Sequence, residues 1–189
     1  MAQSIGAIAA EGLLLGVITT AIVVRSRSFD VPVVWPLVSF SSALLAVIVD
    51  LAFGLLPVFP DAFLYDQMAW DTLQAWQQGQ PLPSMFPNVR TQAYASLVAV
   101  VYAVSGRVPF VAITLNAGIW ALCICYWLRL NREAFTGQSV VLGVLLSVYP
   151  AGVIYASNLL RESLTILFLA ITILHLFRWF QNKDLNNAI

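Results

Sequence analysis

The uncharged run PFVAITLNAGIWALCICYWL, residues 109–128, decides the fold class of this chain. A helix rises about 1.5 Å per residue, so about 20 apolar residues cross a hydrocarbon core that is about 30 Å thick. The rest of the chain has the same character, because 60% of its 189 residues are hydrophobic and only 10% are charged. Soluble domains are about 45–50% apolar and about 25% charged. The sequence therefore predicts an all-α, polytopic membrane helical bundle, with residues 1–189 as a single transmembrane domain.

The charge balance and the rare residue types exclude several classes of function. Nine Lys/Arg against nine Asp/Glu give no net charge, so the chain is not a basic protein that binds nucleic acid. Cys123 and Cys125 diverge by about 200° on a helix and cannot form a disulfide with each other. His175 is the only histidine, which excludes a histidine-rich metal site within this chain.

Further apolar segments flank the opening run, at residues 5–24, 33–58, 93–105, 140–156 and 164–180. The first of these has no basic residue before it, whereas a secretory signal would, so we expect a retained helix. Residues 93–105 are too few to cross a bilayer unaided. The segment 140–156 contains Pro150 but is otherwise apolar, and we expect it to cross.

The basic residues set the expected topology, because cytoplasmic loops are enriched in Lys and Arg. If residues 93–105 do not cross, the tight basic clusters all face one side. We therefore expect five spanning helices, with six as the alternative, an outside N-terminus and a cytoplasmic C-terminus. This describes a multi-pass protein of the cell (inner) membrane. The residues expected on the cytoplasmic side are Arg25, Arg27, Arg129, Arg132, Arg178 and Lys183.

The long outer loop, residues 59–107, opens with the acidic stretch PDAFLYDQMAW. Asp61 follows a proline and is expected to cap a helix over residues 61–78, which Pro81 and Pro83 would end. Asp61, Tyr65 and Ala69 are spaced by four residues, so they lie near one helical face. We expect an amphipathic helix at the outer membrane face. Its first carboxylate is placed to act as a base or a metal ligand, or simply as a helix cap.

The second polar motif is the pair Arg161-Glu162, which follows segment 140–156. Charged groups beside apolar helices are costly unless they are paired or functional. In the five-span topology this pair faces the same side as Asp61, although it is 100 residues away. The alternative is an interfacial pair that reaches water. Glu11 and Asp50 are weaker candidates of the same kind, because they lie inside apolar segments.

These motifs resemble the membrane glycosyltransferases of the GT-C fold, of the arabinosyl- and mannosyltransferase type, and in particular their amino-terminal module. The resemblance rests on Asp61, Tyr65 and Ala69, on Leu115-Asn116, and on Pro150 followed by Glu162, whereas Ala62 departs from the family pattern. It covers residues 33–180, with residues 5–24 as an extra helix.

The resemblance implies transfer of a sugar from a polyprenyl-phosphate donor at the outer membrane face. Asp61 and Glu162 would be the catalytic residues and the ligands of a divalent metal, Mg²⁺ or Mn²⁺. Tyr65, Asp66 and Arg161 would bind the substrate. The lipid bilayer and the lipid-linked sugar are then the expected partners.

Two other functions remain open at this point. The shortness of the chain and the scarcity of polar groups inside its helices also fit a non-catalytic integral membrane subunit. Such a subunit would pack against other membrane subunits of a larger complex. A part of a transporter or of a polysaccharide polymerase is the third possibility.

Overall fold

The computed structural model describes residues 5–57, 59–80, 89–135 and 140–187, and these residues form helices and no strand. The all-α class is therefore confirmed for the described part of the chain. The helices are α1 (Ile5–Phe29), α2 (Val34–Phe53), α3 (Pro60–Gln77), α4 (Val89–Ser105), α5 (Pro109–Phe135), α6 (Val140–Val148), α7 (Pro150–Ala156) and α8 (Glu162–Asn187).

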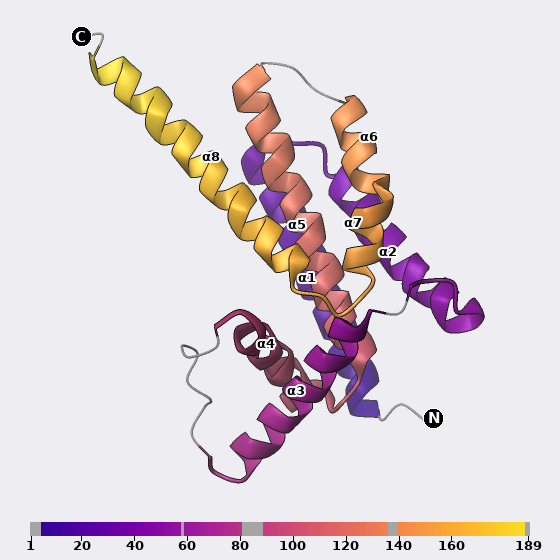
Figure 1. Ribbon diagram of the computed structural model, residues 1–189. Helices are drawn as coiled ribbons and strands as arrows, with labels where there is room; N and C mark the ends of the chain where they lie inside the picture. The colour runs from indigo at the N-terminus through magenta and orange to yellow at the C-terminus, as the bar shows by residue number, and fades with distance from the viewer. Residues whose placement is uncertain (1–4, 58, 81–88, 136–139, 188–189) are drawn as a thin grey trace.

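Four of the described helices are long and apolar enough to cross a membrane, namely α1, α2, α5 and α8. Helix α5 is the centre of the bundle, and α1, α2 and α8 pack around it (Figure 1). In α5, 78% of the most apolar 18-residue stretch is buried inside the protein, whereas the buried share of that stretch is 11–28% in α1, α2 and α8. The three outer helices therefore keep broad apolar faces that lipid can cover.

The remaining expected span, residues 140–156, is two short helices rather than one. Helix α6 has nine residues and α7 has seven, and Pro150 is the first residue of α7. Proline lacks an N–H group and clashes with the preceding turn, which breaks a helix. Figure 1 shows α6 and α7 following one another alongside α2 and α5. Neither is long enough to span alone, so the described helices establish four candidate spans.

Helices α3 and α4 pack side by side at one end of the bundle and form a second apolar core (Figure 1). The buried face of α3 consists of Tyr65, Ala69 and Leu73, at the four-residue spacing predicted from the sequence. The predicted helix over residues 61–78 is thus confirmed, whereas Pro81 and Pro83 lie outside the described residues. Helix α4 has 17 residues and packs along α3, so it is not among the candidate spans.

The expected capping role of Asp61 is wrong. Phe59 occupies the N-cap of α3 and makes no side-chain cap hydrogen bond, and Pro60 starts the helix. Asp61 is the next residue and its side chain is exposed. A proline suits the first helical position, because its missing N–H would have no partner there. The Asp61 carboxylate therefore does not serve as the cap of α3.

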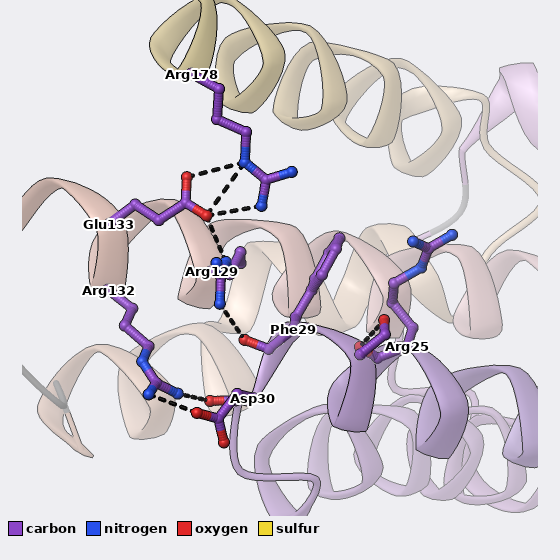
Figure 2. Close-up of polar contacts among 8 residues, drawn as sticks. Arg25, Phe29, Asp30, Arg129, Arg132, Glu133 and Arg178 are labelled. Atoms are coloured by element: carbon purple, nitrogen blue, oxygen red, sulfur yellow. Dashed lines mark hydrogen bonds and ion pairs between the residues drawn. The ribbon is translucent and has the colours of Figure 1, made fainter. Parts of the chain in front are cut away.

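The opposite end of the bundle is held by a network of ion pairs (Figure 2). Glu133 of α5 accepts hydrogen bonds from Arg129 on the same helix and from Arg178 of α8. Arg132 pairs with Asp30, just after α1. Arg129, Arg132 and Arg178 thus gather at one end of the bundle, which we call the basic end, while their cytoplasmic location stays a prediction. The side chain of Lys183 is outside the described part.

Candidate functional site

The start of α3 and the turn between α7 and α8 lie next to each other. Phe59 contacts Tyr155 of α7, with ring centroids 6.2 Å apart. Leu159 of the turn is buried in the same apolar cluster as Tyr65 and Tyr94. These contacts place the start of α3, which carries Asp61, next to the turn that leads to Arg161 and Glu162. The common outer side expected for these residues stays a prediction.

Asn116 fixes the shape of the α7–α8 turn. Its amide nitrogen donates to the backbone carbonyls of Tyr155 and Asn158, at 2.9 and 2.7 Å. The side chain is 1% exposed, and a buried amide needs such partners to offset its lost hydration. Asn116 belongs to the residues that carry the resemblance. Helix α5 begins at Pro109, two turns earlier.

The charges of Asp61, Arg161 and Glu162 all act on the pKa of the Tyr65 hydroxyl. Burial is the main cause that raises the pKa of Tyr65. The Arg161 guanidinium opposes this rise, while Glu162 and Asp61 add to it. Since a charge influences a hydroxyl appreciably only at short range through protein and water, the result ties residues on α3 and α8 to one polar region. We call Asp61, Tyr65, Tyr94, Arg161 and Glu162 the α3–α8 cluster.

Tyr94 of α4 is a member of this cluster that the sequence did not single out. Its ring meets that of Tyr65 edge to face at 5.0 Å, and its side chain is 3% exposed. Burial raises the pKa of Tyr94 strongly, and the negative charge of Glu162 adds to the rise. The available signal was the four-residue spacing of Tyr94, Val98 and Tyr102, which places them on one face of a helix.

Arg161 and Glu162 pair only loosely. Their closest charged atoms are 4.0 Å apart, and the side chains are 36% and 38% exposed. The Oε2 atom of Glu162 is nevertheless buried without a hydrogen-bond partner among the described residues. The same holds for Oγ of Ser163 and for Oδ1 of Asn116. These unpaired buried atoms, two at the start of α8 and one on α5, call for an explanation, and a hydroxyl-bearing ligand would provide hydrogen-bond donors.

Asp66 is engaged inside the protein. It accepts a hydrogen bond from the Tyr102 hydroxyl at 2.5 Å and pairs with Arg107 at 2.5 Å. Arg107 also lies over the ring of Trp70, 5.7 Å from its centroid. These contacts tie α3 to α4 and to the segment after α4. The geometry therefore fits a scaffold role for Asp66 better than the expected contact with substrate.

The described residues contain no group of three His, Cys, Asp or Glu side chains close enough to hold a metal ion. Mg²⁺ and Mn²⁺ prefer several oxygen ligands. Asp61 and Glu162 supply two carboxylates, and Arg161 already brings a positive charge to Glu162. These residues fit a metal poorly without further ligands, so we derive no step through a metal.

The other polar candidates have local partners. Thr114 of α5 donates to Oε1 of Glu11 at 2.7 Å, which links α1 to the central helix, while Oε2 of Glu11 is buried without a hydrogen-bond partner among the described residues. Asp50 accepts from the backbone N–H of Leu56 at 2.7 Å and so closes the end of α2. His175 is exposed on α8, where its ring nitrogen contacts the carbonyl of Ile171. The α3–α8 cluster is therefore the strongest candidate site in the described part of the chain.

Comparison of the chain with known protein families, with curated proteins and with solved structures gives no match. The fold and the cluster define the class of protein: an all-α chain with four helices suited to a membrane and a polar cluster at one end of its bundle.

Proposed function

We propose that this chain is a membrane glycosyltransferase module that transfers a sugar from a polyprenyl-phosphate donor at the outer membrane face. The observation that carries the proposal is the packing of the start of α3 against the α7–α8 turn, through Phe59 on Tyr155 and through Leu159 in the apolar cluster of Tyr65. This packing places the exposed Asp61 carboxylate next to the turn that leads to the loosely paired Arg161. A glycosyl transfer from a phosphate needs these two kinds of group, one to take a proton and one to receive a departing anion.

The proposal includes a topology of five crossings in the cell (inner) membrane, with α6 and α7 together as the fourth crossing in chain order. Two short helices can complete one crossing when protein covers the break between them. One face of the pair is closely packed, because a Cβ added at Gly143 or Gly152 would meet the side chain of Trp35 or Trp120. Val148, Tyr149 and Pro150, at the break itself, are exposed on the other side, so the proposed crossing requires a further contact that covers them.

Each charged group has a distinct part in the proposed reaction. The acceptor hydroxyl gives its proton to the Asp61 carboxylate as its oxygen forms a bond to the glycosyl carbon. The bond from that carbon to the phosphate oxygen breaks, and the lipid phosphate leaves with the electron pair. Arg161 and the free N–H groups at the start of α8 stabilise the departing phosphate. Glu162 and Asn116 accept hydrogen bonds from sugar hydroxyls.

The test uses the full chain in lipid nanodiscs with radiolabelled polyprenyl-phosphate hexose and pentose donors. Asp61→Asn should abolish release of the polyprenyl phosphate, a loss of about 10²-fold or more, because the amide cannot accept the proton. Asp71→Asn is the matched control, since Asp71 is another exposed carboxylate on α3 and contacts only Gln67 in the described part.

Binding of the lipid phosphate provides a second measurement. Arg161→Gln should weaken the retention of polyprenyl phosphate in native mass spectrometry, whereas Asp61→Asn should leave it unchanged. Equal activity of the Asp61 and Asp71 variants, or no donor turnover by the wild-type protein, would rule out the enzymatic function.

The alternative is a non-catalytic membrane subunit within a larger complex. Helix α1 favours it through an open small-residue face, because Gly12 and Gly16 have no heavy atom within 4 Å of an added Cβ. Spacing of four residues between glycines lets another helix approach closely. Under this alternative, crosslinking from α1 captures a partner chain, and the substitutions at Asp61 and Arg161 have no effect on any lipid substrate.

A further inference from the structure

A groove of about 440 Å³ lies at the basic end, between α1, α5 and α8. Its volume falls within the range of about 300–1,000 Å³ that is usual for small-molecule sites. The inner walls are apolar and the mouth is polar, with a cation and a hydroxyl. The lining residues are Ala21, Val24, Arg25, Ser28, Leu122, Tyr126, Leu167 and Ile171.

Arg25, at the mouth, differs from the three arginines of the ion-pair network. Arg129, Arg132 and Arg178 each pair with a carboxylate at 2.5–2.7 Å. Arg25 instead lies over the rings of Phe29 and Tyr126, 5.0 and 5.3 Å from their centroids. Figure 2 shows its guanidinium apart from the ion-pair network, with no carboxylate contact drawn to it. Its side chain is exposed, so the guanidinium can receive an anion.

The depth of the groove fits a lipid rather than a water-soluble anion. Arg25 lies about one turn before Phe29, where the apolar part of α1 ends. Long basic side chains near a helix end reach the headgroup level of a bilayer. On α5, Leu122 is one turn from Tyr126 on the side away from the basic end. Leu167 and Ile171 precede Arg178 on α8 in the same way, so the apolar walls run from the headgroup level toward the membrane centre.

We propose that this groove binds an anionic phospholipid, with its phosphate at Arg25 and one acyl chain along Leu122 and Leu167. Basic pockets between transmembrane helices are suited to anionic headgroups, since cation and phosphate attract each other strongly near the low-dielectric membrane. The occupied groove joins α1 to α8, which meet α5 from different sides. The inference depends on the membrane location of the bundle and not on the proposed transferase activity.

Native mass spectrometry of the full chain, released from nanodiscs, tests the site. The discs contain equal amounts of phosphatidylglycerol and phosphatidylcholine with identical acyl chains. The wild-type protein should retain phosphatidylglycerol preferentially. Arg25→Gln should lower this retention about five-fold, the effect of one basic residue near a membrane surface.

Two further variants distinguish binding in the groove from general electrostatic attraction of the lipid to the protein surface. Arg27→Gln removes the same charge from the same helix end, but Arg27 points about 200° away and does not line the groove, so retention should change less than two-fold. Ala21→Leu keeps Arg25 and fills the apolar wall, so it should also release the lipid. Retention of helicity, measured by circular dichroism, shows that each variant is folded.

Three results would overturn the proposal. Equal losses for Arg25→Gln and Arg27→Gln would mean that only surface charge attracts the lipid. Unchanged retention in Ala21→Leu would mean that the acyl chain lies elsewhere. Displacement of the lipid by millimolar glycerophosphoglycerol, the same headgroup without chains, would identify a site for a soluble phosphate instead.

Discussion

The link between Tyr102 and Asp66 gives the sharpest test of how α3 is held, and through it of how Asp61 is positioned. Tyr102→Phe keeps the aromatic ring, which is 1% exposed, and removes only the hydroxyl. That hydroxyl donates to Oδ1 of Asp66 at 2.5 Å. The variant therefore leaves a carboxylate oxygen between α3 and α4 without its donor.

The expected cost follows from the type of hydrogen bond and its exposure. Hydrogen bonds to charged groups contribute about 1.5–3 kcal/mol. The Asp66 side chain is 18% exposed, so water partly replaces the lost donor and the lower end applies. Arg107, the other partner of Asp66, is 35% exposed, and exposed ion pairs are worth about 0–1 kcal/mol. Tyr102→Phe should consequently destabilise the α3–α4 pair more than Arg107→Gln does.

Hydrogen exchange measures this local effect. A loss of about 1.5 kcal/mol raises the local opening constant about tenfold, so the amides of α3 should exchange about tenfold faster. Exchange in α5, the central helix, should stay unchanged. Tyr149→Phe is the matched control, because Tyr149 lies outside the α3–α4 pair and is 56% exposed. A larger effect from Arg107→Gln, or equal effects from both tyrosine variants, would refute the reasoning.

Three further predictions concern topology, packing and pH. Single cysteines at Gln78 and Asn182 should react with membrane-impermeant reagents from opposite sides, and labelling from one side would contradict five crossings. Gly152→Ala should destabilise the protein by about 1–3 kcal/mol in thermal unfolding, because its Cβ would meet Trp120, while Gly12→Ala has open space and should not. Three tyrosines have raised pKa values, so they should ionise after ordinary tyrosines in an ultraviolet titration. The unfolded chain releases these protons from about pH 10 while the folded chain keeps them, so stability should fall as the pH rises above about 10. Normal titration of all tyrosines would contradict the burial of Tyr65, Tyr94 and Tyr102.

Regular patterns in the sequence predicted the elements whose structure depends on local spacing. The four-residue repeat of Tyr65 and Ala69 gave the buried face of α3, because helical periodicity alone decides which side chains share a face. The clustering of basic residues likewise followed from charge counting. Both predictions needed only the order of residues along the chain.

The features that the sequence did not predict depend on effects that the spacing of residues along the chain does not encode. Pro150 divides the expected span 140–156, although apolar composition alone indicates one helix. Asp66, for which the resemblance implies substrate contact, also accepts a hydrogen bond from Tyr102, 36 residues away, which the sequence did not predict. Tertiary contacts of this kind decide whether a polar side chain is free. A single sequence offers no signal for them beyond residue type.

The carboxylates at the two ends of the bundle differ in their hydrogen bonding, and this difference indicates which end is the better candidate for a ligand site. At the basic end, Glu133 accepts hydrogen bonds from two arginines and leaves no oxygen without a donor. At the other end, Glu162 keeps a buried oxygen without a partner in the described part, beside a cation 4.0 Å away. A satisfied ion-pair network rigidifies a protein, whereas unpaired buried polar atoms are retained mainly where a ligand completes them. The ion pairs of the basic end therefore serve to hold α1, α5 and α8 together. The proposed substrate should bind at the α3–α8 cluster, where Glu162→Gln should change ligand retention more than it changes thermal unfolding.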